Sequence, residues 1–318
     1  MRQSQPARAA VRTVLGDIPA AELGVCDAHD HLFFRSPQLP GQELDDPEAA
    51  TQELCAFREL GGQAVVQWSP FGTARRTDAL PQVSRDAGVH IVAATGLHQA
   101  AHCAPGVLER VTHRLAELFV AELTEGVRRD EDPDGPAEPV RAGLIKVAGA
   151  FHGLDAHARQ VMTAAAEAHH ATGAPIAVHH ELGTAPLDVL DLLCGRLAVP
   201  PTSVVLGHLN RSPDLRVQRE AAESGAFLAF DGPSRANHAT DWRLFDSLVT
   251  LAASGHADQV LIGADTTTAA ARAASGGGPG MPFLLRVLRP RIVRELGEEV
   301  ANAFFVANPA RAFAVEWR

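Results

Sequence analysis

The chain has 318 residues, of which 46% are hydrophobic, and this is enough apolar material to bury a large core. The formal net charge is −10 with histidine neutral. An acidic surface repels phosphate backbones and anionic lipid, so we expect neither nucleic acid nor membrane partners. No signal peptide or membrane-spanning run is expected. The four cysteines are scattered without metal or redox spacing, which indicates reduced thiols and a cytoplasmic protein.

Short apolar runs, several of them rich in β-branched residues, alternate along the chain with amphipathic stretches. Residues 1–22 precede them as an N-terminal extension, in which Val11–Ala21 predicts a short lid or hairpin over the bottom of a barrel. Most runs are apolar without strict alternation, as is typical of strands buried on both faces in a parallel sheet. The eight predicted strands are Val25–Ala28, Ala64–Gln67, His90–Ala94, Leu144–Val147, Ile176–Val178, Ser203–Leu206, Phe227–Phe230 and Val260–Ile262.

The segments between these strands have helical periodicity. Eight repeats of strand and helix predict an α/β fold, a single (β/α)8 TIM barrel that covers residues 1–318 as one domain. An open doubly wound sheet is the alternative, but the GxGxxG sequence that often accompanies it is missing after the first strand. The long loop 266–280, which follows the eighth strand, predicts a substrate-binding wall or lid. Predicted helices include Asp46–Leu60, Leu108–Arg128, Ala156–Thr172, Pro186–Leu197, Pro213–Ser224 and Asp241–Gly255.

Several of the predicted strands end in a potential metal ligand, at the edge where the reactive side chains of a barrel lie. His29 and His31 are two residues apart on extended backbone, so both project from the same face. His179 ends the fifth strand, and His208 follows the sixth strand after a glycine. Asp265 ends the eighth strand, where an aspartate taken alone could equally cap the next helix.

Lys146 lies inside the apolar fourth strand, where a buried ammonium group is costly. Taken alone, this residue is explained most simply by a side chain that reaches the rim or pairs with a carboxylate. The alternative is that its amine has reacted with carbon dioxide and bridges two ions as a carbamate. The first, fourth, fifth, sixth and eighth predicted strands each carry such a residue at the same end. If none of these residues bound a metal, five separate strands would have to carry a potential ligand there by coincidence. The set therefore predicts two divalent ions held by His29, His31, Lys146, His179, His208 and Asp265.

The order HxH, Lys, His, His and Asp resembles the phosphotriesterase family of the amidohydrolase superfamily, across essentially the whole chain. The segments IKVAG, TGAPI, LGHLNRSPD, FDGPSR, GGGPG and FFVANPARAF are similar to motifs of that family. HLNRSPD, FDGPSR and GGGPG resemble most its lactonase branch, which includes hydrolases of phosphorylated sugar lactones. The resemblance also implies a homodimer.

The resemblance further implies how the two ions are held. His29, His31 and Asp265 would bind the more buried ion, and His179 and His208 the more exposed one. Carbamylated Lys146 and a hydroxide would bridge both ions. Zn²⁺ is the expected metal, with Mn²⁺ or Co²⁺ as alternatives.

Two stretches depart from the phosphosugar lactonases. That branch is expected to carry a Lys-Tyr pair after FDG-x-x-R, and Arg and Tyr after the strand-8 aspartate. Here the stretches read Arg235-Ala-Asn237-His238 and Asp265-Thr-Thr-Thr-Ala, and the chain contains no tyrosine. Apart from Arg235, the groups that would bind a phosphate are missing. This favours a small-molecule substrate that is neutral or anchored differently.

The predicted function is that of a binuclear metal-dependent hydrolase, in which the metal-bridging hydroxide attacks the carbonyl of a carboxylic ester or lactone. Asp265 and Lys146 are the expected catalytic residues, and Asp265 can accept the proton of the hydroxide. The alternatives are a phosphotriester or organophosphate hydrolase, a mononuclear deaminase, which Lys146 disfavours, and a non-catalytic small-molecule-binding barrel. The residues considered for the substrate pocket are Trp68, His98, His102, His152, Arg235 and His238.

Overall fold

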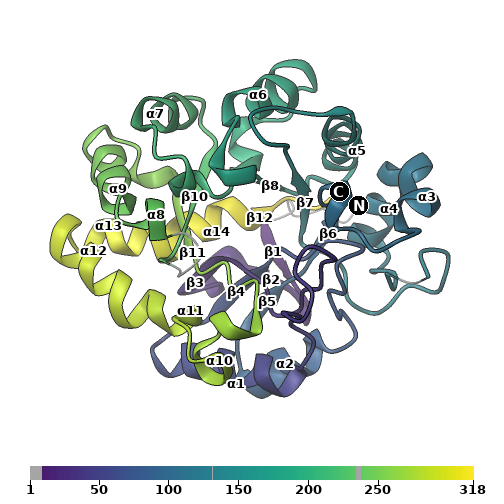
Figure 1. The fold of residues 1–318 in the computed structure, drawn as a ribbon, viewed down its shortest axis with the longest axis horizontal. Helices are drawn as coiled ribbons and strands as arrows, with labels where there is room; N and C mark the ends of the chain where they lie inside the picture. The colour runs from purple at the N-terminus through teal and green to yellow at the C-terminus, as the bar shows by residue number, and fades with distance from the viewer. Residues whose placement is uncertain (1–8, 131, 234–237) are drawn as a thin grey trace, which may run out of the picture.

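The computed structural model describes residues 9–130, 132–233 and 238–318. Within these ranges the predicted (β/α)8 barrel is confirmed, with parallel strands around a central axis and helices outside them (Figure 1). All eight predicted strands are present, with ends that differ by a few residues. They are β3 (Cys26–Asp30), β4 (Ala64–Gln67), β5 and β6 (His90–Val92 and Ala94–Gly96), β7 (Leu144–Ala148), β8 (Ile176–His179), β9 (Val204–Leu206), β10 (Phe227–Asp231) and β11 (Val260–Gly263).

The circle of strands closes between the last strand and the first. The third barrel strand is divided at Ala93, so that β5 pairs with β4 and β6 pairs with β7. After β11, the Asp265 N–H donates to the carbonyl of His29 in β3 at 2.9 Å. The Asp30 carboxylate strengthens this seam, because Oδ1 accepts from the Thr266 N–H at 2.7 Å. The closed circle rules out the open doubly wound sheet.

Both faces of the strands are apolar, which explains the absence of strict alternation. Ala64 and Leu144 are buried in the interior of the barrel, whereas Val65 and Ile145 pack in the larger layer between strands and helices. Lys146 follows Leu144 by two residues and therefore faces the barrel interior. The period of a buried strand thus decides on which side this amine lies.

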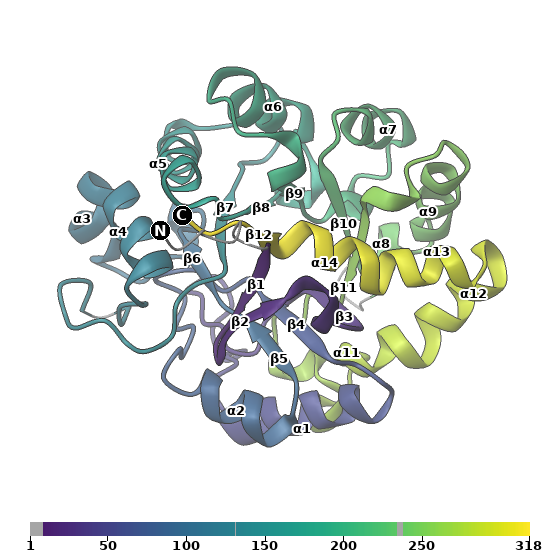
Figure 2. The same ribbon diagram turned by 180° about the vertical axis from the view of Figure 1, so that it is seen from behind.

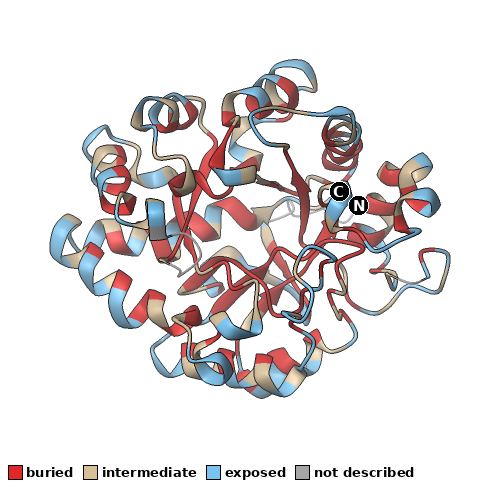
Figure 3. Ribbon diagram, viewed as in Figure 1, coloured by how far each residue is buried: buried red, intermediate tan, exposed pale blue. Residues whose placement is uncertain are grey.

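The helices turn their buried faces toward the strands and their exposed faces outward (Figure 3). The predicted helix Leu108–Arg128 is divided at a 3₁₀ turn into α3 and α4, and the predicted helix Asp241–Gly255 is divided into α8 and α9. None of the described helices is long and apolar enough to cross a membrane. The α-helices are α1 (Pro47–Glu59), α2 (Leu80–Ala87), α3 (Val107–Val111), α4 (Leu115–Thr124), α5 (Ala156–Thr172), α6 (Pro186–Leu190), α7 (Leu215–Glu223), α8 (His238–Asp241), α9 (Leu244–Ala253), α10 (Ala273–Gly276), α11 (Gly280–Phe283), α12 (Arg289–Leu296), α13 (Glu298–Asn302) and α14 (Asn308–Phe313).

The N-terminal segment forms the predicted hairpin. Strands β1 (Ala10–Thr13) and β2 (Gly16–Pro19) are antiparallel, and β12 (Ala314–Val315) pairs with β1. Val11 is fully buried and packs in the same cluster as Cys26, at the start of β3. Seen from behind, the hairpin and α14 lie across the barrel (Figure 2). They close the N-terminal end of the strands, which leaves the C-terminal end for the site.

Candidate metal centre

The C-terminal ends of the strands surround a cavity of about 400 Å³. Five of the six predicted metal ligands line it: His31, Lys146, His179, His208 and Asp265. The sixth, His29, is buried beside them, with its ring centroid 4.8 Å from that of His208. Residues separated by more than 200 positions in the sequence therefore meet in one place.

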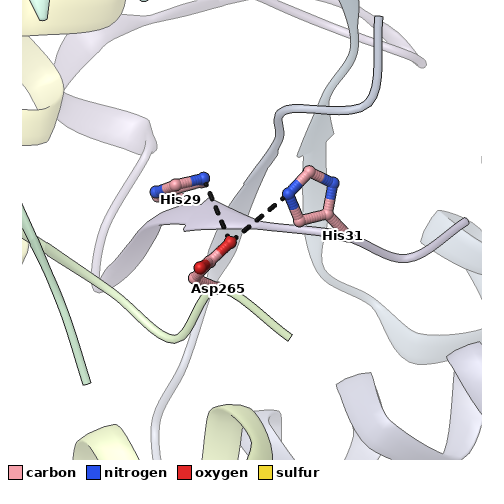
Figure 4. Close-up of side chains that lie close together, drawn as sticks. All are labelled: His29, His31 and Asp265. Carbon is pink, nitrogen blue, oxygen red and sulfur yellow. Dashed lines mark ion pairs between the residues drawn. The ribbon is translucent and has the colours of Figure 1, made fainter. Parts of the chain in front are cut away.

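His29, His31 and Asp265 form a cluster suited to a cation. The Nε2 atoms of His29 and His31 lie 3.4 and 3.5 Å from the same oxygen, Asp265 Oδ1 (Figure 4). Asp265 Oδ1 and His29 Nε2 are buried, and neither has a hydrogen-bond partner among the described residues. Unsatisfied buried polar atoms are costly. A divalent ion bound by these three side chains would give each of these buried atoms a partner, so this donor set fits a metal.

His179 and His208 form the outer pair of potential ligands. His179 Nδ1 and His208 Nε2 face each other at 2.8 Å. Burial lowers the pKa of His179 to about 4 and that of His208 well below its usual value, so both rings are neutral at neutral pH. Two neutral imidazole nitrogens can share one proton or turn their lone pairs to a cation. The outer pair therefore also fits a metal.

Lys146 is 1% exposed, and burial lowers its pKa to about 7. A large share of the amine is therefore neutral and nucleophilic near neutral pH. The sequence contained a further signal, since Lys146 is the only lysine in the chain and every other residue of its 28 Lys and Arg is arginine. Arginine serves for surface charge, but its guanidinium does not deprotonate in proteins. The single lysine of the chain lines the cavity beside His31, His179 and His208.

The backbone turns two of the ligands into the cavity through unusual conformations. His208 and Asp265 have φ values of 62° and 52°, in the left-handed region that residues other than glycine rarely adopt. Such conformations persist where surrounding contacts hold them, and they cluster at functional sites. Gly207 and Gly263 come shortly before these residues, and a Cβ atom at Gly263 would collide with the backbone of His29.

Asp231 and Arg211 complete the centre, although sequence reasoning did not single them out. Asp231, at the end of β10, places Oδ1 3.2 Å from His29 Nδ1 and Oδ2 2.7 Å from His208 Nδ1. Because Asp231 contacts the Nδ1 atoms, the Nε2 atoms of both rings stay available to bind a metal ion. Asp231 lies at the end of its strand, as the predicted ligands of five other strands do, so the same rule applies to it.

Arg211 pairs with both carboxylates. Its Nε lies 3.0 Å from Asp231 Oδ2, and it also contacts Asp265 Oδ2. Burial alone would raise the pKa of Asp265, but Arg211 and the imidazoles outweigh burial and hold this pKa well below its usual range. Asp265 is therefore an anion at neutral pH.

Replacement of Asp231 by asparagine is expected to weaken metal affinity by about 10- to 100-fold, because an amide holds the two imidazoles less firmly in one tautomer. Titration of the metal-free protein with Zn²⁺ in the presence of a competing chelator measures this affinity. Asp258→Asn, at an exposed position, is the matched control. Equal affinities in both variants would show that Asp231 does not orient the ligands.

The predicted pocket residues have different outcomes. His98 and His102 line the cavity, and His102 Nδ1 lies 2.8 Å from Ser36 Oγ. His152 is exposed and is not part of the lining. Arg235 lies outside the described residues, as does the side chain of His238.

The prediction that Trp68 lines the substrate pocket is wrong. Its side chain is fully buried, the indole N–H donates to the carbonyl of Ala28 at 2.9 Å, and the ring stacks on His29 with centroids 3.8 Å apart. Trp68 follows Val66 by two residues, so it continues the inward-facing row of β4. It packs against His29 and does not line the cavity.

The loop that follows the eighth strand, residues 266–280, forms one wall of the cavity, as the sequence predicts. Its lining residues are Thr267, Thr268, Ala270, Ala271, Gly278 and Pro279. Phe34 and Leu39 contribute further apolar surface. The side chains of this wall are small and uncharged, and most are apolar, so the wall suits an uncharged group of the substrate.

Comparison with known proteins agrees with this geometry. The model of the phosphotriesterase family matches residues 9–313. The phospho-furanose lactonase of Mycoplasmopsis agalactiae is 32% identical over 256 residues, which cover 74% of this chain and 70% of that protein. The N-acetyltaurine hydrolase of Danio rerio is 25% identical, with coverage of 96% and 97%. A solved lactonase structure from Listeria monocytogenes superimposes with a TM-score of 0.86 at 27% identity, covering 96% of this chain and 98% of that one. The resemblance inferred from the sequence is confirmed, and the chain belongs to the phosphotriesterase family.

Proposed function

We propose that this protein is a binuclear metal-dependent hydrolase of carboxylic esters, lactones in particular. The observation that carries the proposal is the meeting of four imidazoles, Lys146 and Asp265 at the C-terminal end of the barrel. Imidazole and carboxylate donors suit Zn²⁺, with Mn²⁺ or Co²⁺ as alternatives. The hydrolases and lactonases among the relatives support the same reaction class.

We assign Lys146 the role of bridging ligand. Its neutral amine adds to carbon dioxide, an N–C bond forms, and one N–H proton leaves to solvent. The product is an anionic carbamate with two oxygen donors, on β7, the strand next to β8, which carries His179. Its negative charge offsets the charge of two cations in a buried site.

When bound, two divalent ions would supply an activated water at neutral pH and polarise the carbonyl oxygen of the substrate. Asp265 accepts the proton of the attacking water as the new C–O bond forms. It then returns this proton to the alkoxide that leaves as the ester C–O bond breaks. A lactone needs little further help, because its alkoxide stays tethered to the acyl group.

The charges around the cavity favour a substrate without a phosphate group. Glu181 lines the cavity as an anion, since the hydrogen bond from His179 lowers its pKa to about 2. Arg211, the one described arginine of the lining, is paired with two carboxylates. An anionic group placed against this side of the cavity would therefore meet the carboxylate of Glu181, while the described arginine of the lining is already paired.

Phosphotriester hydrolysis is the second candidate. A neutral triester would suit the same apolar wall, and the structure of a mutant organophosphorus hydrolase from Deinococcus radiodurans superimposes with a TM-score of 0.82 at 25% identity. The two candidates differ in the group that the wall must accept, a planar acyl carbon or a tetrahedral phosphorus.

A substrate panel with the metal-loaded protein tests the proposal. It contains one lactone with and without a phosphate group, an open-chain ester and a phosphotriester. We expect two metal ions per chain and a kcat/KM for the unphosphorylated lactone at least about tenfold above the others. A preference for the phosphorylated lactone would overturn the assignment of a neutral substrate. Two bound ions without hydrolysis of any ester would overturn the proposed reaction.

A further inference from the structure

The buried carboxylate of Glu53 holds the wall of the cavity from a helix that does not itself reach the cavity. Glu53 lies on α1 and is fully buried. Its Oε1 accepts from the N–H groups of Ala273 at 3.2 Å and Met281 at 3.0 Å, and its Oε2 accepts from the N–H of Ala274 at 2.8 Å. Burial of a carboxylate is costly unless hydrogen bonds compensate it. Here the compensation comes from the backbone of the wall.

The GGGPG sequence of the loop is explained by the same contact. Gly280 has a φ of +54°, and a Cβ atom at this position would collide with Glu53 Oε1. The chain can therefore approach the carboxylate only without a side chain at this point. Arg272 is also buried here and donates to the carbonyl of Leu32, which ties the start of this segment to the end of β3.

The anchored residues enclose those that line the cavity. Ala274 and Met281 are held by Glu53, and between them Gly278 and Pro279 lie in the cavity wall. The first part of the loop is held separately, since Thr266 donates to Asp30. Loss of the Glu53 contacts would free the second part of the wall and leave the metal ligands in place.

We infer that Glu53 is a positioning residue that determines which acyl groups the cavity accepts, because it fixes the second part of the wall, between Ala273 and Met281, which places Gly278 and Pro279 in the cavity. The effect on acyl selection rests on the proposed function. The fixing of the wall does not, because it follows from the hydrogen bonds alone.

The test compares Glu53→Gln with Glu122→Gln. Glutamine at position 53 presents an NH₂ group to backbone N–H donors that need an acceptor. Glu122 is an equally buried carboxylate on α4 that accepts from the side chains of Arg75 and Thr95 and from the backbone N–H of Arg128, so it is the matched control for a general loss of stability. Gly280→Ala disturbs the same anchor from the side of the loop, and serves if Glu53→Gln does not fold.

Hydrogen exchange is the readout that does not depend on activity. In Glu53→Gln and Gly280→Ala, we expect faster exchange of the amides of Ala273, Ala274 and Met281, and unchanged exchange in β3 and β11. In Glu122→Gln these amides should keep their protection. Unchanged exchange in the two anchor variants, or the same increase in the control, would overturn the anchoring of the wall.

Kinetic measurements on Glu53→Gln test whether the anchored wall determines which acyl groups the cavity accepts. For the best lactone, KM should rise by about tenfold, more than kcat falls, and the preference between short and long acyl chains should narrow. Metal content should stay the same. Faster exchange with an unchanged KM and preference would overturn the role in selection. If no ester is hydrolysed by the unaltered protein, the proposed function fails, while the exchange experiment still decides whether Glu53 anchors the wall.

Discussion

Substitution of Lys146 by alanine is expected to remove the paired metal site and to lower kcat/KM by at least about 10³-fold, because the ions contribute several kcal/mol to the stabilisation of the transition state. Lys146 lines the cavity with both sets of imidazoles, and without its carbamate the positive charges of two ions would repel each other at close range. Elemental analysis should show a fall from two metal ions per chain to one or none. A short-chain carboxylate added in solution should restore part of the activity, since it offers the two missing oxygen donors.

Lys146→Arg is the matched control for this prediction. It keeps a long basic side chain but cannot form a carbamate. If the carbamate is the functional group, this variant is as inactive as Lys146→Ala. Because the chain has no other lysine, ¹³C-labelled bicarbonate should give one ε-carbamate signal in the NMR spectrum, absent from both variants. Two bound ions and an unchanged rate in Lys146→Arg would exclude the carbamate.

Replacement of Asp265 by asparagine should have an effect of similar size. The amide loses the charge that both His29 and His31 approach through Asp265 Oδ1, and it cannot take up a proton from the attacking water. We expect weaker binding of the more buried ion and a loss of at least about 10³-fold in kcat/KM. Arg211 retains Asp231 as a partner, so the barrel should still fold.

The same variant separates a metal ligand from a helix cap, the alternative left open by the sequence. A lost cap would reduce stability by about 1 kcal/mol and leave the metal content intact. Metal analysis and thermal unfolding of Asp265→Asn distinguish these outcomes. A normal metal content together with a lower Tm would refute the role of Asp265 as a ligand.

Much of the fold followed from local patterns. Strands buried on both faces are mostly apolar runs, so the eight strands could be recognised one at a time, and a hairpin at Val11–Ala21 was one of the two structures expected there. The division of Leu108–Arg128 into two helices was not predicted, because the helical period continues across the 3₁₀ turn at Thr112–Arg114. Helix ends depend on packing partners that the local sequence does not contain.

The site also combines features that the local sequence predicts with features that depend on contacts between distant residues. The meeting of the predicted ligands in one cavity followed from one rule, since side chains at the C-terminal ends of the strands of a barrel lie at the same edge. The same rule applies to Asp231 at the end of β10, although the sequence analysis does not include this residue among the candidates. Trp68 was misplaced because its direction depends on the phase of β4, which carries it under His29 and away from the cavity.

The sequence by itself determined the barrel and the residue types at the ends of its strands, because each buried strand is recognised from its own apolar run and carries its own terminal side chain. Only the tertiary structure decided how these groups are held. The contacts of Asp231 with two imidazoles, of Arg211 with two carboxylates and of Glu53 with the wall join residues up to 228 positions apart. Such contacts depend on which buried polar atoms the packed barrel brings within hydrogen-bond distance, and spacing along a chain does not record that.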